Sequence, residues 1–466
     1  EIANRISEVG AYLGPEIILA FPKERSGRLP VLLAQAARPD VLVSALEGDL
    51  RRLSETGQTS FRLARNAAEL AAMTGSGLVI YVDDGLMIVS DAAQVQRTAA
   101  IHRGTTPGNF SGTPLFGRLE QAYNEGVGWL LAVDLQQIVK PDDAAVRQLG
   151  FENVQQLVLE QKTGGIGSAA SLVTLGFSQE RHGLPAWLGT PAPMGALDFI
   201  SPSAYGFSAW ITKDAELILD DVLGLASGDN PLAQHLRAFE ESHRIDVRHD
   251  LAEPLGNEVL VAIDGPVLPT PSWKVVFEIN DGPRLENAIQ WAVTNLNQEA
   301  EARGLPTWTL ESESVDGKVY HALTSKGSPM EFHYTSWMGY MVVASSRALL
   351  TDAIRIHDSG NSINHSAAFR ALMPSDGRDT ASAIMYQNAE ALAQSASSIT
   401  DAASQQLSEN LRQAALLQSA FPKVVFVYGE PNRIMGSAQG SFGIRIASML
   451  GFRNLIGAAG FGTFPH

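Results

Sequence analysis

Two adjacent serines stand where a hydrolase would carry its nucleophile. The stretch GYMVVASSRALLTDAI, from Gly339 to Ile354, joins an apolar run to a helical pattern through Ser345 and Ser346. A strand-to-helix nucleophile elbow needs the pentapeptide G-x-S-x-G, because only flanking glycines permit the crowded turn. The chain contains no such pentapeptide. A serine hydroxyl that accepts a hydrogen bond from the first turn of a helix explains the position, so we predict helix capping.

Histidines are the other residues whose spacing could carry chemistry, as zinc ligands. The ten histidines form no H-E-x-x-H motif. Two pairs could meet in space, namely His243 with His249 and His321 with His333. We interpret these four as ordinary surface or interface residues. His102 and His357 follow two similar helical stretches, where an imidazole complements the helix dipole. We therefore predict no metal site.

Glycine-rich and acidic motifs also have structural explanations. KTGGIGSAAS lies between predicted strands, and the glycines of GAAGFGTF fit no nucleotide-binding fingerprint. The acidic pairs do not match a calcium-binding loop, and we assign them to a hairpin turn, a helix start and a solvated helix face: Asp83-Asp84, Asp142-Asp143 and Asp220-Asp221. The sequence thus predicts no catalytic residue and no cofactor, so we expect the protein not to be an enzyme.

The composition restricts the classes of partner. The formal net charge is −16, which repels nucleic-acid phosphates and anionic membrane surfaces. The absence of cysteine excludes disulfides and thiolate chemistry. No apolar run reaches the ~18 residues of a membrane helix. The nearest candidate, GLVIYVDDGLMIV, is interrupted by Asp83-Asp84 and predicts two strands joined by a tight turn.

An internal repeat organises the elements around these motifs. GLMIVSDAAQVQRTAAIHRG from Gly85 matches GYMVVASSRALLTDAIRIHDSG from Gly339, and LGPEIILAF matches LGNEVLVAI. Near the end of each half, the segment from Val154 matches the segment from Val424. Matches in the same order predict a tandem duplication, with the first repeat at 1–198 and the second at 199–466.

The second repeat opens with a segment that has no match in the first. ISPSAYGFSAWITKDAELILDDVLGLA, which begins near Phe199, predicts a strand and a helix. The first repeat enters at a later point of the pattern. We therefore expect a longer precursor, in which this opening strand and helix and a targeting segment precede Glu1.

The elements of the second repeat predict the fold class. Their order is strand, helix, strand, strand, helix, strand, which is the ferredoxin-like order. Further strands and helices follow to the end of the repeat. We expect an α+β fold in which each repeat is a mainly antiparallel sheet with helices on one face.

The C-terminal segment is unusually apolar. From Ile434 to His466 it is rich in glycine, phenylalanine, leucine and isoleucine. Such a segment either packs on its own domain or contacts a membrane or a partner. For the second alternative, the candidate partner-binding residues are Phe442, Ile446, Met449, Leu450, Phe452, Leu455 and Phe461.

Several segments resemble a known bacterial family. PLGNEVLVAIDGPVLPTPSWKVVFEI, GYMVVASSRALLTDAI and FRALMP are similar to the pattern of exported proteins catalogued as a domain of unknown function. The resemblance implies a duplicated α+β unit. It also implies a periplasmic, extracellular or envelope location, reached through a signal or anchor outside this chain. The family has no established activity, so no site residue is carried over.

The leading functional hypothesis is a non-catalytic, exported envelope protein that binds a protein partner or serves as an accessory subunit. An alternative is a carrier of an apolar small molecule, held between the repeats or under a curved sheet, in a cavity above roughly 300 Å³. A less favoured alternative is a hydrolase whose serine, histidine and aspartate come from distant positions. The sequence leaves the oligomeric state open.

Overall fold

The computed structural model describes most of the chain. The described residues are 10–21, 30–55, 61–75, 77–106, 110–163, 169–225, 234, 238, 240–242, 245–266, 271–328, 330–374, 378–398, 405–419 and 423–439. The seven candidate partner-binding residues, from Phe442 to Phe461, lie outside these ranges, and so does His243.

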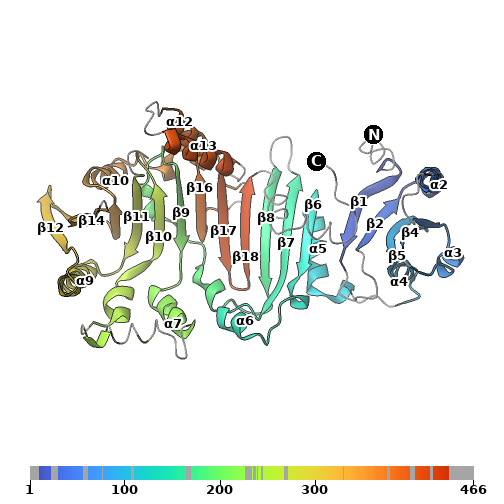
Figure 1. The fold of residues 1–466 in the computed structure, drawn as a ribbon, viewed down its shortest axis with the longest axis horizontal. Coiled ribbons are helices and arrows are strands. Elements are labelled where there is room, and N and C mark those ends of the chain that lie inside the picture. Colours follow the sequence, from blue (N-terminus) through green and yellow to red (C-terminus); the bar gives the residue numbers. More distant parts are fainter. Residues whose placement is uncertain are drawn as a thin grey trace. The chain divides into compact units, whose positions relative to one another are not determined.

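The described chain divides into two compact units, one up to Arg118 and the other from Leu119. The predicted repeat boundary, between Asp198 and Phe199, is a different division and stays a prediction. The first unit holds a five-stranded sheet of order β1-β2-β5-β4-β3 (Figure 1). Its elements are β1 (Leu13–Ala20), β2 (Val31–Ala36), α2 (Pro39–Glu55), β3 (Arg62–Ala64), α3 (Ala67–Ala71), β4 (Leu78–Asp83), β5 (Leu86–Asp91), α4 (Ala92–His102) and the 3-10 helix η1 (Phe110–Gly112); α5 (Pro114–Asn124) spans the division.

The second unit holds a sheet of thirteen strands in the order β12-β13-β14-β15-β11-β10-β9-β16-β17-β18-β8-β7-β6. The strands are β6 (Trp129–Asp134), β7 (Val154–Thr163), β8 (Ala169–Phe177), β9 (Gly206–Ile211), β10 (Leu255–Ile263), β11 (Trp273–Ile279), β12 (Trp308–Val315), β13 (Lys318–Ser325), β14 (Phe332–Trp337), β15 (Tyr340–Ala344), β16 (Ala383–Gln387), β17 (Val424–Glu430) and β18 (Arg433–Gln439). The α-helices are α6 (Ala144–Leu149), α7 (Ala215–Leu225), α9 (Gly282–Ala302), α10 (Arg347–Ser359), α11 (Ala367–Arg370), α12 (Ala389–Ser398) and α13 (Gln405–Ser419). Short helical turns are η2 (Leu135–Gln137), η3 (Leu184–Trp187), η4 (Gly195–Phe199), η5 (Arg248–Ala252) and η6 (Ile363–His365).

Two-residue turns set the hairpins of both units. Asp84-Gly85 joins β4 to β5, Asp316-Gly317 joins β12 to β13, and Met338-Gly339 joins β14 to β15; all six residues have positive φ. Positive φ at both central positions is the type I′ geometry, whose twist matches that of the flanking strands. The tight turn predicted at Asp83-Asp84 is confirmed, with Asp84 and Gly85 as its central residues.

Of the two adjacent serines, Ser346 caps a helix, as predicted. The side chain of Ser346 accepts a hydrogen bond from the amide of Leu349 at 3.2 Å, in the first turn of α10. In the first repeat, Asp91 accepts from the amide of Gln94 at 3.1 Å at the start of α4. Serine and aspartate supply the same acceptor oxygen to an otherwise unpaired amide, so they are interchangeable here.

The two repeats share strand order and register. The order β1-β2-β5-β4 of the first corresponds to β10-β11-β15-β14 of the second. The pair β1–β2 shifts register between Leu13 and Ile17, and β10–β11 shifts between the equivalent residues Leu255 and Val259. A shared irregularity at the same place is difficult to explain except by duplication. The fold is therefore α+β, built from a tandem duplication of a mainly antiparallel sheet unit.

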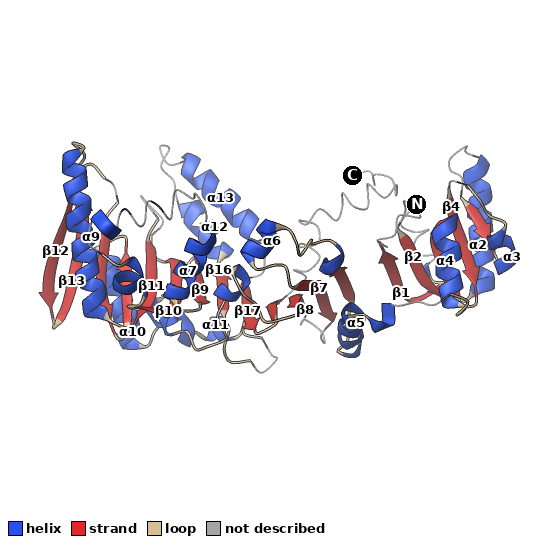
Figure 2. Ribbon diagram, turned by 90° about the horizontal axis from the view of Figure 1, so that it is seen from below, coloured by secondary structure: helices blue, strands red, loops and turns tan. Residues whose placement is uncertain are grey.

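Helices cover both faces of each sheet, so the prediction of helices on one face was wrong. Successive strand residues point to opposite faces. In the second unit, Val342 packs with Leu350 of α10, whereas the preceding Met341 packs with Leu285 of α9. In the first unit, α4 and α2 divide the two faces in the same way. Figure 2 shows α9 and α10 on opposite sides of the larger sheet.

The predicted ferredoxin-like order was also wrong. The elements follow the predicted chain order β9, α7, β10, β11, α9, β12. In space, however, β9, β10 and β11 are successive antiparallel neighbours. In a ferredoxin-like sheet, two strands joined through a helix are parallel, and another strand lies between them. Here α7 joins β9 to β10, but these two strands are antiparallel neighbours.

Candidate partner-binding face

A serine, a histidine and an aspartate meet at η6, as the hydrolase alternative requires. The Ser362 hydroxyl lies 3.1 Å from Asp198 Oδ1 and 3.0 Å from His365 Nδ1. The same Nδ1 lies 3.5 Å from Asp198 Oδ1. A catalytic triad uses the two ring nitrogens separately, one toward the serine and the other toward the acid. Here both contacts fall on one nitrogen, and Ser362 is buried, so the cluster fixes a loop.

A second cluster, with a glutamate in place of the aspartate, surrounds His321. Its Nδ1 lies 2.8 Å from Ser312 Oγ and 3.4 Å from Glu286 Oε1, so one nitrogen again receives both contacts. The imidazole stacks on Tyr334, with ring centroids 4.5 Å apart. Tyr334 also donates to Glu286. This cluster connects α9 to three strands and leaves His321 nearly buried.

The remaining predicted motifs have structural partners. His102 lies in the last turn of α4 and His357 in that of α10, as predicted. His333 contacts Glu331, and His249 contacts Glu253. Asp143 caps α6, as predicted for a helix start. Within the described residues, no group of three or more acidic or histidine side chains could hold a metal ion.

Two buried carboxylates position the segment that runs from η4 into β9, across the predicted start of the second repeat, which we call the opening segment. Glu258 accepts hydrogen bonds from the amides of Gly195 and Ala196 and from the Tyr340 hydroxyl, at 3.1, 2.8 and 2.8 Å. Burial raises the pKa of the Glu258 carboxyl. Asp264 and Lys274 form a buried ion pair of 2.7 Å.

This ion pair continues into the same segment. Asp264 accepts from the amide of Ser201, and Lys274 donates to the carbonyl of Phe199. Buried charges need such partners, because burial without them carries a large desolvation penalty. The opening segment is therefore fixed to β10 and β11 by polar contacts at both ends of η4.

An apolar surface lies on the opposite face of the central strands. Residues directly opposite one another on neighbouring strands share a face. The registers of β10, β9, β16, β17, β18 and β8 place on one face a set of residues that we call the outer apolar face: Val261, Ile263, Trp210, Met385, Val425, Val427, Ile434, Gly436, Val173 and Leu175. The alternate residues of these strands, such as Phe207 and Phe426, lie in the main hydrophobic core on the other face.

Part of the outer apolar face is exposed to solvent. Trp210 is 37% exposed, Val261 49%, Ile263 37% and Met385 38%. Ser208 separates Val261 from Met385 in these registers, but an apolar surface of this extent is still uncommon on proteins without a binding role. Tryptophan and methionine are also residue types that are enriched at protein interfaces.

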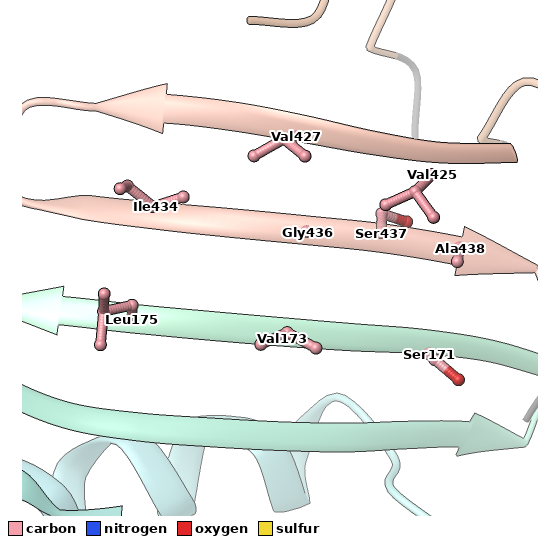
Figure 3. Close-up of a pocket in the computed structure, with 9 residues that line it drawn as sticks. All are labelled: Ser171, Val173, Leu175, Val425, Val427, Ile434, Gly436, Ser437 and Ala438. Atoms are coloured by element: carbon pink, nitrogen blue, oxygen red, sulfur yellow. The ribbon is translucent and has the colours of Figure 1, made fainter. Parts of the chain in front are cut away.

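The face is hollowed where the two repeats join, at the β8–β18 pair. Figure 3 shows Val427, Gly436 and Val173 in a row across β17, β18 and β8. A Cβ added to Gly436 would lie 4.0 Å from its nearest neighbours, both in Val173, so the missing side chain creates the hollow. The pocket has a volume of about 210 Å³ and a nearly apolar lining.

A second pocket is polar. It has a volume of about 380 Å³ and is lined by residues such as Ser203, Tyr205, Gln394 and Ser395. The Tyr205 hydroxyl and the Ser395 hydroxyl lie 2.5 Å apart, which closes part of its wall. Its polar lining does not suit an apolar ligand.

The outer apolar face was not predicted from the sequence. A signal was present in VVFVY, from Val424 to Tyr428, where apolar residues occupy every position rather than alternate positions. Such a run indicates a strand that is apolar on both faces. It could not show which face belongs to the core, because that depends on the strands that pair with it.

Comparisons with protein-family models, with curated proteins and with solved structures find no match for this chain. The family resemblance noted in the sequence therefore stays a prediction. In the described part of the chain, no helix combines the length and the apolar character that a membrane crossing requires.

Proposed function

We propose that the protein is a non-catalytic accessory protein that binds a protein partner through the outer apolar face. The observation that carries this proposal is the exposure of Trp210, Val261 and Met385 on a sheet face that is continuous with the hollow at Gly436. An exported envelope location, implied by the family resemblance, is part of the proposal.

A protein partner suits this surface better than an apolar small molecule does. The hollow holds about 210 Å³. Small-molecule sites usually enclose roughly 300 Å³ or more and bury most of the ligand. The outer apolar face spreads over six strands. Such an extent suits a protein interface, which buries roughly 800 Å² on each partner.

Binding to the partner that co-purifies from the native envelope fraction tests the proposal. Mass spectrometry identifies that partner, and titration of the purified pair gives Kd. Trp210→Ala should weaken binding by about 30-fold or more, because buried tryptophans dominate interface energetics at about 2 kcal/mol or more. Val261→Lys should also weaken it, because it places a charge in an apolar contact.

A matched substitution controls for general effects of added charge. Val319 of β13 is 48% exposed, nearly the same as Val261, and lies outside the outer apolar face. Val319→Lys should leave Kd unchanged. Equal losses for the two lysine variants, or full affinity of Trp210→Ala, would show that the partner does not use this surface.

A further inference from the structure

The second repeat contains a strand whose place is empty in the described part of the first. β9 lies between β10 and β16 and runs antiparallel to both. β10 corresponds to β1 by the shared register shift. β17 corresponds to β7 by sequence, and the orders β16-β17-β18 and β6-β7-β8 then make β16 the counterpart of β6. Both β1 and β6 are terminal strands of their sheets. Within the described residues, each therefore lacks a strand neighbour on the side where its counterpart pairs with β9.

Side-chain burial shows the same difference. Leu260 of β10 is fully buried, in the core cluster that contains Phe199 and Ala209 of the opening segment. Its counterpart in β1, Ile18, is 42% exposed, and the adjacent Ile17 is 61% exposed. A long apolar edge strand is a template for pairing with another strand. The side chains of β1 are thus as apolar as those of β10, which has a strand paired along the corresponding edge.

We infer that the outer edge of β1 takes up a β9-type strand, the counterpart of β9 that completes the first repeat. The β9–β10 register predicts the arrangement, which is antiparallel with the position of Ala209 opposite Ile18 and that of Trp210 opposite Ile17. The inference rests on the duplicated topology and is independent of the outer apolar face.

The backbone hydrogen bonds identify which amides would pair. Thr212 donates to the carbonyl of Asn257 in β10, whereas Ile211 donates to the carbonyl of Ser382 beside β16. Alternate residues of a strand bond to opposite neighbours. Ser208 and Trp210 therefore face β10, and the same positions of a β9-type strand would face β1.

A peptide with the sequence of residues 203–212, SAYGFSAWIT, is the probe. Titration of the labelled peptide into the whole 466-residue chain, followed by fluorescence anisotropy, measures binding. Amide hydrogen exchange locates the site. We expect hydrogen exchange at the amides of Ile17 and Leu19 to slow by a factor of about ten or more. A factor of ten equals about 1.4 kcal/mol of added protection.

Two N-methylated peptides form the matched control. Methyl groups on the amides at the positions of Ser208 and Trp210 remove donors that face β1, so binding should be lost. Methyl groups at the positions of Phe207 and Ala209 leave those donors intact, so binding to β1 should persist.

Three outcomes would overturn the inference. The first is the absence of added protection in β1 at saturating peptide. The second is equal binding of the two methylated peptides. The third is a concentration-dependent dimer that protects β1 without peptide, because a second copy of the chain would then occupy the edge.

Discussion

At the scale of single residues, the polar groups buried in the second repeat hold one segment in place. Glu258 and the Asp264–Lys274 pair together bind four backbone groups between Gly195 and Ser201. Their burial gives these contacts a larger effect on stability than surface ion pairs have. Two predictions follow from this difference in environment.

Lys274→Met should lower the free energy of unfolding by about 3–5 kcal/mol, because it leaves Asp264 buried without its cation. The ion pair Lys213–Asp221 is the control, since its side chains are partly exposed. Lys213→Met should cost about 1 kcal/mol or less. Urea denaturation measures both variants, and equal effects would contradict the importance assigned to burial.

Glu258→Gln should show a stability difference from the wild type that depends on pH. Burial raises the pKa of Glu258 above its ordinary value of 4.5. The folded state then holds this proton more tightly than the unfolded state does. The associated stability is fully present below the unfolded pKa and is lost as pH rises through the folded pKa.

The wild type should therefore lose stability relative to Glu258→Gln as the pH rises from below 4.5 through the raised pKa of Glu258. A Glu258→Gln difference that stays constant with pH would contradict the assigned direction of the pKa shift.

At the scale of elements, the turn between β14 and β15 has a residue that does not suit its backbone. Met338 has φ of 50°, where the first-repeat counterpart is Asp84 with φ of 51°. Residues other than glycine, asparagine and aspartate are disfavoured at positive φ. Met338 is 64% exposed, so its replacement removes little packing.

Met338→Asn should raise the free energy of unfolding by about 0.5–1 kcal/mol, because asparagine tolerates the left-handed conformation. Met330 is 53% exposed but does not have positive φ, and Met330→Asn is the control. Thermal unfolding compares the two. A gain for both variants, or for neither, would show that the turn conformation is not the cause.

Local patterns predicted these elements well. The hairpin at Asp83-Asp84, the cap at Ser346 and the histidine at the end of α10 each depend on residues close in sequence. The placement of helices on both faces did not follow from the same patterns. Met341 and Val342 are both buried, so the strand shows no polar face that would indicate where solvent lies.

At the scale of the whole molecule, the sequence revealed the duplication but not the sheet order. Similar segments show that two units share a fold, whereas β9 pairs with β16 across residues that lie far apart in the chain. The outer apolar face was missed for the same reason. It combines Val173 of the first repeat with Trp210 and Val427 of the second, and only strand pairing places them on one surface.

Site-specific photo-crosslinking tests the proposed partner-binding role most directly. A photoreactive amino acid replaces Val261 on the outer apolar face or the equally exposed Val319 outside it, and the native host is irradiated. We predict one adduct of constant mass from position 261, its loss when Trp210→Ala is added, and no such adduct from position 319. The same adducts from both positions, or none from position 261, would contradict a partner bound at this face.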